Sequence, residues 1–195
     1  MIFTGTMHMP FLIPEQKFAV VEHDNEGRGG LINTTFYFDA MLGEFVAALE
    51  NEPWWKDTLL IITADHRSGR FIGPKSSIPL IFYAPQYLKP QVKKVLSSQV
   101  DFVPTIFDLF RWDHPYAGIG RSIFAPGPRL VVQRDGDVMG LIQEKPEAFL
   151  QMKAGQLINS TLGPAETAAG QKFILALQQV LMETFAQRRV CPDQD

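Results

Sequence analysis

The stretch that decides the fold is DTLLIITADH, residues 57–66. Its apolar part, Leu59–Ile62, is short for a helix and has the continuous hydrophobicity of a strand buried on both faces of a parallel sheet. A polar end follows at once, with Asp65 and His66. Because ligands gather at the carboxyl ends of strands in open α/β sheets, this end is the predicted place for a functional site.

A helix is predicted before this strand, at residues 36–50. Asn33 or Thr34 is expected to cap its first turn, and Pro53 prevents it from running on. The apolar residues that recur on one helical face are Phe38, Met41, Leu42, Phe45 and Leu49.

After the strand, residues 78–83 (IPLIFY) are expected to form a second buried strand, and residues 102–110 a helix capped by Asp101. This order of helices and strands is typical of an α/β fold in which helices cover a largely parallel sheet. Met1 is followed directly by Ile2 and Phe3, with no polar lead, so the chain is expected to begin inside a strand.

The pattern changes at residue 129. Two short strands, at residues 129–134 and 137–143, flank the turn dipeptide Asp135-Gly136, which is a strong hairpin signal. A final helix is expected after Gly163-Pro164. Its expected inward face is Phe173, Leu177, Val180, Leu181 and Thr184.

We therefore predict two domains, residues 1–128 and residues 129–195, the second being a small antiparallel sheet with one packed helix.

Composition limits the possible functions. The chain has 195 residues, 46% of them hydrophobic and 20% charged, which is typical of a globular protein. Its 18 basic and 21 acidic residues give a net charge of −3, so there is no general electrostatic reason to bind nucleic acid or an anionic membrane. No apolar run reaches the roughly 20 residues of a membrane helix. The single cysteine, Cys191, excludes an internal disulfide and a cysteine-based metal site.

Asp65 and His66 offer a carboxylate oxygen and an imidazole nitrogen side by side, and both suit a divalent cation. Two ligands never make a full site, however. The alternative is that Asp65 caps a turn while His66 covers a surface.

Two further residues are candidates for contact with an anion. His8 lies in a loop that Pro10 makes rigid, and it either presents its imidazole to a ligand or bonds to nearby backbone. Lys75 follows Arg67 and Arg70, and such basic side chains either hold a phosphate or sulfate oxygen or form a solvated basic loop.

Together these features resemble the C-terminal half of the sulfatase-like proteins of the alkaline phosphatase superfamily. The resemblance is strongest to the branch of lipoteichoic acid synthases and phosphoglycerol transferases, in which a loop like TMHMPF at 6–11 also occurs. Five blocks in order carry it: YFDAMLGEF at 37–45, DTLLIITADH at 57–66, IPLIFYAP at 78–85, VDFVPTI at 100–106 and GIGRSI at 118–123.

The resemblance implies an alkaline-phosphatase-like α/β/α sandwich, with residues 1–128 as the C-terminal portion of a catalytic domain. In the family a divalent cation (Mn²⁺, Mg²⁺, Ca²⁺ or Zn²⁺ here) activates a Thr, Ser or modified Cys nucleophile. Asp65 and His66 match two of the cation's ligands. His8 matches a histidine that contacts the substrate, and Lys75 is compared with an anion-holding lysine.

By the same resemblance, the substrate is a phosphate or sulfate ester, such as a phospholipid head group or a glycan. The parent protein is expected to work outside the cytoplasm, on the periplasmic or cell-surface side, anchored in the membrane by N-terminal helices that these residues do not contain.

Two departures from the family qualify this expectation. The family's nucleophile and first acidic ligand lie well upstream of the His8 loop, so no catalytic residue is assigned here and the isolated chain is expected to be inactive. Arg67 also stands where the family often has glycine. The alternatives are a non-catalytic sulfatase-like module that binds lipid or a protein partner, and an unrelated α/β domain in which Asp65 and His66 form only a turn.

Overall fold

The structure, a computed structural model, describes residues 1–67, 77–116, 118–144 and 148–187. Two compact units divide the chain. Unit 1 comprises Met1–Ile61 and Phe82–Lys89, and unit 2 comprises Ile62–Ile81 and Pro90–Asp195.

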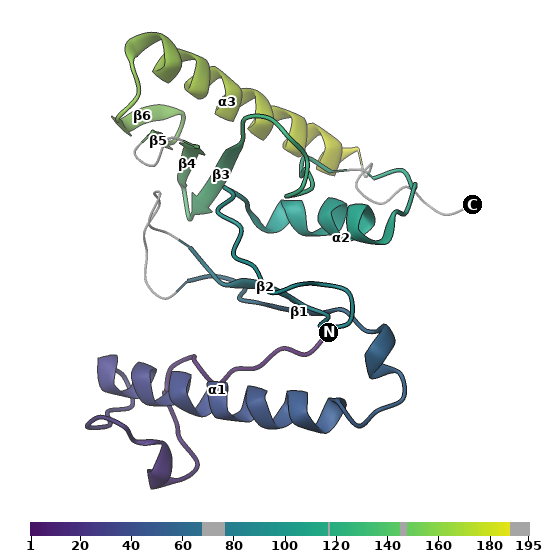
Figure 1. The fold of residues 1–195 in the computed structure, drawn as a ribbon. Coiled ribbons are helices and arrows are strands. Elements are labelled where there is room, and N and C mark those ends of the chain that lie inside the picture. Colours follow the sequence, from purple (N-terminus) through teal and green to yellow (C-terminus); the bar gives the residue numbers. More distant parts are fainter. Residues whose placement is uncertain (68–76, 117, 145–147, 188–195) are drawn as a thin grey trace. The chain divides into compact units, whose positions relative to one another are not determined.

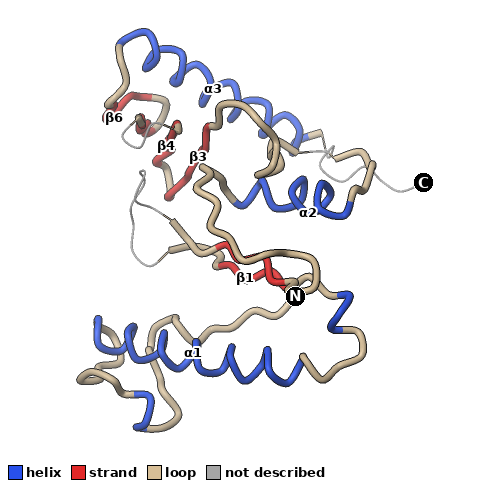
Figure 2. Tube along the Cα trace, in the orientation of Figure 1, coloured by secondary structure: helices blue, strands red, loops and turns tan. Residues whose placement is uncertain are grey.

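The chain forms helices, short 3-10 helices (η) and strands (Figures 1 and 2). In chain order they are η1 (Gln16–Phe18), α1 (Arg28–Leu49), η2 (Trp55–Asp57), β1 (Leu60–Thr63), β2 (Leu80–Tyr83), η3 (Gln99–Asp101), α2 (Phe102–Phe110), β3 (Leu130–Asp135), β4 (Val138–Gln143), β5 (Phe149–Lys153), β6 (Gln156–Ser160) and α3 (Pro164–Ala186). The predicted α/β class is confirmed. Among the described residues, no helix is both long enough and apolar enough to cross a bilayer.

The first five residues belong to no strand, contrary to the expectation that the chain begins inside one. Met1, Ile2 and Phe3 are exposed. Apolar residues form a strand only where a neighbouring strand takes their backbone hydrogen bonds, and the described sheets include no strand here.

α1, in unit 1, begins well before the predicted residue 36, because Asp24 supplies its cap. The Asp24 carboxylate accepts hydrogen bonds from the backbone N–H of Gly27 and, at 3.2 Å, from that of Gly29. These N–H groups belong to the first turn of the helix and have no partner within it. The helix start is therefore set by an aspartate in the preceding loop.

Asn33 and Thr34, the predicted caps, lie inside α1 and are fully buried. The Asn33 oxygen accepts hydrogen bonds from the backbone N–H of Val20 (2.9 Å) and Val21 (3.1 Å). Its side-chain nitrogen donates to the Val21 carbonyl at 3.0 Å and to Nδ1 of His23 at 3.1 Å. These bonds fix the loop before α1 to the helix, and they give the buried Asn33 amide the partners that a buried polar group needs.

β1 and β2 form a two-stranded sheet, and every residue of both strands is half-buried or exposed. The expectation that Leu59–Ile62 is buried on both faces is therefore wrong for this structure. The expectation of a largely parallel sheet concerned the residues before 129, and it stays a prediction. The pairings whose register is defined run from β3 to β6 and are all antiparallel, as the sequence predicted for this region. Two-residue turns join β3 to β4 and β5 to β6, and such short connections suit antiparallel pairing, because a parallel crossover needs a dozen residues or more.

The four strands β3–β6 form an antiparallel sheet in sequence order (Figure 2), and they confirm the predicted C-terminal sheet. The first hairpin is confirmed, but its two turn residues are Gly136 and Asp137. They lie one position later than the predicted Asp135-Gly136, because Asp135 is the last residue of β3. Gly136 has φ +61°. The hairpin of β5 and β6 was not predicted. It turns at Ala154 and Gly155, which have φ of +47° and +79°, the pattern of a type I′ turn.

α3 packs against β4 and β5 (Figure 1). This region has its own core of Met139, Leu141, Leu150, Met152 and Ile174. The domain boundary at residue 128 stays a prediction.

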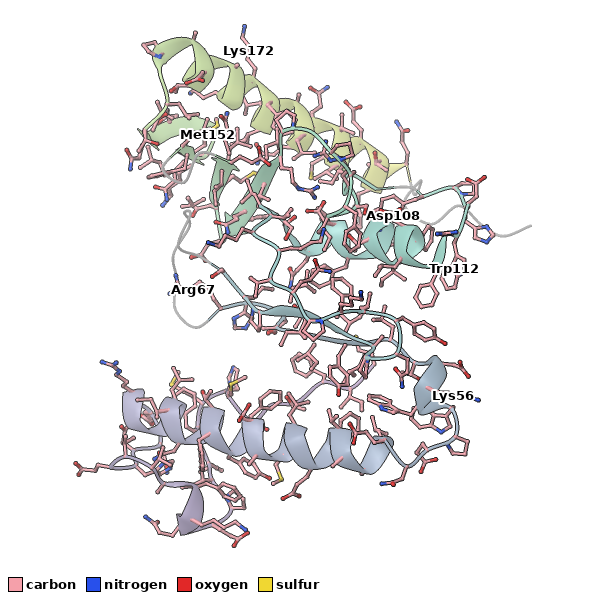
Figure 3. All side chains as sticks on the ribbon, viewed as in Figure 1. Lys56, Arg67, Asp108, Trp112, Met152 and Lys172 are labelled. Atoms are coloured by element: carbon pink, nitrogen blue, oxygen red, sulfur yellow. The ribbon has the colours of Figure 1, made fainter. Side chains whose placement is uncertain are left out.

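The face of α3 that meets the sheet differs from the predicted one. Thr167, Gly170 and Ile174 are its buried residues, whereas Val180 and Leu181 are exposed. Figure 3 shows Lys172 pointing away on the side of α3 opposite the sheet. The small residues explain the difference, because they let the helix approach closely. A Cβ on Gly170 would lie 2.2 Å from Cδ2 of Leu150.

Candidate metal site

Asp65 and His66 lie directly after β1 and face each other. Oδ2 of Asp65 is 3.4 Å from Nε2 of His66, and Oδ1 of Asp65 accepts a hydrogen bond from the His66 backbone N–H at 2.8 Å. Their side chains are 55% and 72% exposed, respectively. The end of the strand thus presents one carboxylate and one imidazole to solvent, close enough to share a single ligand.

The orientation of the His66 ring is set by its other nitrogen, Nδ1, which lies 2.9 Å from the Arg67 carbonyl oxygen. A carbonyl oxygen only accepts hydrogen bonds, so Nδ1 carries the proton. In the neutral ring Nε2 then has a lone pair, and it lies near a carboxylate oxygen of Asp65 that also has only lone pairs. Two such acceptors repel unless positive charge lies between them, either a proton on Nε2 or a cation.

The pair fits a divalent cation in donor type and in spacing. Nitrogen and oxygen ligands each about 2.1 Å from one cation, at a tetrahedral angle, lie about 3.4 Å apart. The bond from Nδ1 of His66 to a backbone carbonyl is the outer contact that commonly orients metal-binding histidines. Mixed oxygen and nitrogen donors do not select one metal. Within the ranges that the structure describes, no group of three or more His, Cys, Asp or Glu side chains is gathered to hold a metal.

The backbone at the end of β1 is held from two sides. The Thr63 hydroxyl donates to the Pro79 carbonyl at 2.9 Å, which ties the end of β1 to the residue before β2. The Gln99 side-chain nitrogen donates to the carbonyls of Ala64 (3.1 Å) and Asp65 (2.6 Å). Sequence reasoning missed Gln99, which lies 34 residues from Asp65, because no local pattern indicates such a contact.

Asp101 precedes α2, as predicted, but its side chain makes no capping hydrogen bond to that helix. It is buried, and its carboxylate accepts hydrogen bonds from the backbone N–H of Ser98 (2.9 Å) and Arg121 (2.8 Å). It also forms an ion pair with Arg129 at 3.3 Å, in which both side chains are buried. The bond to Ser98 closes a capping box around η3, the turn that carries Gln99.

His8 lies in unit 1, apart in sequence from the pair in unit 2. Its Nδ1 is 2.7 Å from the Met9 carbonyl, and its backbone N–H donates to the Gly5 carbonyl at 3.0 Å. The ring is therefore bonded to its own loop, as one of the two interpretations of the sequence expected. Contact between His8 and a substrate stays a prediction.

Lys75 lies outside the described residues, so its suggested role as an anion-holding residue also stays a prediction.

The fold and this site define a mixed α/β protein with a carboxylate–imidazole pair at the end of a strand. Residues 1–111, which include His8, Asp65 and His66, match the family model described as Sulfatase. The chain belongs to the sulfatase family, and its mixed α/β fold agrees with the expected alkaline-phosphatase-like portion.

A curated relative is the protein named Arylsulfatase K from Gallus gallus, which is 33% identical over 84 residues. The aligned stretch covers 37% of this chain and 16% of that protein. No solved structure matches the chain.

Proposed function

We propose that this chain supplies part of the active site of a metal-dependent esterase that acts on sulfate esters, with Asp65 and His66 as two of the cation's ligands. The observation that supports it most is the 3.4 Å separation between Oδ2 of Asp65 and Nε2 of His66, inside the stretch that matches the sulfatase model. The similarity to a protein named as an arylsulfatase favours sulfate as the ester.

Each residue has a separate task in this proposal. A bound divalent cation supplies positive charge that acidifies a hydroxyl nucleophile and offsets charge developing on the ester oxygens. Oδ2 of Asp65 and Nε2 of His66 hold it, and the Arg67 carbonyl keeps the His66 proton on Nδ1. His8 and Lys75 donate N–H hydrogen bonds to the oxygens of the ester group.

A second candidate substrate is a phosphate ester of the phosphoglycerol type, such as a lipid head group or a phosphorylated glycan. The resemblance of the loop at residues 6–11 to that of phosphoglycerol transferases favours it. For either ester, we propose that the whole protein works on the extracytoplasmic side, anchored in the membrane outside the present residues.

A non-catalytic role, in which the module binds lipid or a protein partner, is favoured only by Arg67 in place of the family's glycine.

The test is a titration of the purified 195-residue chain with Mn²⁺, followed by the paramagnetic broadening of histidine ring signals in NMR spectra. We expect the His66 signals to broaden at a lower Mn²⁺ concentration than those of the other histidines. Asp65→Asn should abolish this difference. Asp137→Asn is the matched control, because Asp137 is similarly exposed (65%) and also lies next to a basic side chain, Lys153, at 3.2 Å. Equal broadening in the two variants would contradict the proposed cation site.

Turnover is tested separately with a chromogenic aryl sulfate and a chromogenic phosphodiester. Two donors are fewer than the four ligands of a typical site, so we expect weak cation binding and no turnover by the isolated chain. Hydrolysis that scales with the concentration of the purified chain would show that this expectation is wrong.

A further inference from the structure

We infer that Gln99 is a positioning residue for the candidate cation site: its side-chain amide holds the turn after β1 so that Asp65 and His66 face each other. This inference rests on the proposed function for the purpose of the turn, but the contact itself does not depend on a metal.

The contact is specific in its geometry. One nitrogen of Gln99 donates to two consecutive carbonyls, those of Ala64 and Asp65, at 3.1 and 2.6 Å. The Ala64 carbonyl belongs to the peptide unit that leads into Asp65, and the Asp65 carbonyl belongs to the one that leads out of it. Fixing both peptide units limits the backbone dihedral angles of Asp65, and with them the direction of its side chain.

The Asp65 side chain in turn restrains the backbone of His66. Oδ1 of Asp65 accepts the His66 backbone N–H at 2.8 Å, and Nδ1 of His66 bonds to the Arg67 carbonyl at 2.9 Å. Hydrogen bonds to the backbone thus hold Oδ1 of Asp65 and Nδ1 of His66. The other two atoms, Oδ2 and Nε2, lie 3.4 Å apart and are the ones proposed to bind the cation. Both side chains are largely exposed, so packing does little to hold them and these bonds matter more.

Gln99 is itself held from the interior of unit 2. It opens η3, whose capping box joins Ser98 to Asp101, and Asp101 is buried against Arg129. Arg129 also donates to the carbonyls of Leu96 (2.6 Å) and Ser122 (2.9 Å). A buried ion pair with satisfied hydrogen bonds is a rigid support, and Gln99 extends from it to the exposed turn.

The experiment compares Gln99→Met, which keeps the length of the side chain but loses the donor, with Gln91→Met. Gln91 is an exposed glutamine in the same connection between β2 and η3. A third variant, Gln99→Lys, restores an N–H donor on a chain of similar length. The purified 195-residue chain is used throughout, with circular dichroism as the check of folding.

Two readouts are needed. The exchange rate of the His66 backbone amide, measured by NMR without metal, reports the order of the turn. The Mn²⁺ concentration that half-broadens the His66 ring signals reports the cation site. We expect Gln99→Met to speed amide exchange and to raise that concentration about 10-fold, the lower end of the effect of removing an outer contact of a metal site. Gln91→Met should match the wild type, and Gln99→Lys should recover the slow exchange.

The outcomes separate the two proposals. If Gln99→Met matches Gln91→Met in both readouts, Gln99 does not position the turn and the inference is wrong. The inference is also wrong if Gln99→Lys exchanges as fast as Gln99→Met. If the wild-type His66 signals ignore Mn²⁺ while Gln99→Met still speeds amide exchange, the positioning role stands and the proposed cation site fails.

Discussion

In the two described sheets, the burial of the strands does not follow the hydrophobicity of their sequences. β1 and β2 come from the most continuous apolar runs, yet each of their residues is half-buried or exposed. β4 comes from a less apolar segment, yet Met139 to Ile142 are all buried. The difference is one of partners, because β4 has a strand on each side and α3 packed on it, whereas within the described residues no third strand pairs with β1 or β2.

This contrast shows where stability and chemistry reside. A two-stranded sheet is marginal by itself. Side-chain bonds add support at its end, where Thr63 of β1 bonds to the Pro79 carbonyl and Gln99 bonds to the turn that follows β1. The four-stranded sheet is stabilised by its own core. The candidate site therefore lies on the less stable of the two sheets, and the following substitutions test that difference.

The largest effect is expected from Arg129→Met. It leaves the buried Asp101 carboxylate without its ion-pair partner and several carbonyls without their donor, so we expect a loss of about 3 to 5 kcal/mol in the free energy of unfolding of unit 2. Urea unfolding followed by circular dichroism measures it. The control is Arg134→Met, because Arg134 is exposed and donates to the Gly136 carbonyl. Similar losses in the two variants would mean that the buried pair is no support for η3.

Leu150→Ala compared with Leu60→Ala tests the contrast between the sheets directly. Leu150 is fully buried in the core under α3, so its truncation should cost about 2 to 5 kcal/mol. Leu60 is half-buried, and its truncation should cost about half as much or less. Hydrogen exchange of the β4 amides, measured for both variants, should be faster only in Leu150→Ala. An equal or larger loss of stability from Leu60→Ala would contradict the assignment of the main core to the C-terminal sheet.

The hairpin of β3 and β4 could be predicted from the sequence, whereas the hairpin of β5 and β6 could not. The Asp135-Gly136 dipeptide indicated a turn because glycine adopts positive φ without strain, as Gly136 does, so the β3–β4 hairpin was found. The turn at Ala154 and Gly155 has positive φ at both residues but begins with alanine, which rarely adopts positive φ, and β5 and β6 were therefore missed. A turn can be predicted from the local sequence only when it contains the residues typical of its type.

Long-range contacts explain the other differences. The position of Asp65 and His66 at a strand end follows from an apolar run followed by polar residues, which is a local pattern. The support from Gln99 and the pairing of Asp101 with Arg129 depend on tertiary contacts that the pattern does not contain. The prediction of the inward face of α3 was wrong for a similar reason, because the helix packs through Thr167 and Gly170 rather than through its largest apolar residues.

Gly170→Ala compared with Gly43→Ala sharpens the contrast between a packed and a loosely packed helix. The new Cβ at position 170 would lie 2.2 Å from Cδ2 of Leu150, and overpacking of this kind costs about 1 to 3 kcal/mol. At Gly43, inside α1, nothing lies within 4 Å, so the higher helix propensity of alanine should add about 0.5 to 1 kcal/mol. Thermal unfolding should thus shift in opposite directions. A stabilised Gly170→Ala variant would show that α3 does not approach the sheet this closely.

The smallest effect is expected from Asp65→Asn in the absence of metal. The side chain is 55% exposed and its neighbours are backbone groups and His66, so the free energy of unfolding should change by no more than about 0.5 kcal/mol. With Mn²⁺ present the result should differ, because a cation that binds only the folded state stabilises it in proportion to its affinity. The wild type should then unfold at a higher temperature as Mn²⁺ is raised, while Asp65→Asn should not. A large loss of stability without metal would mean that the pair serves the fold rather than a ligand, and this comparison therefore separates a structural turn from a binding site.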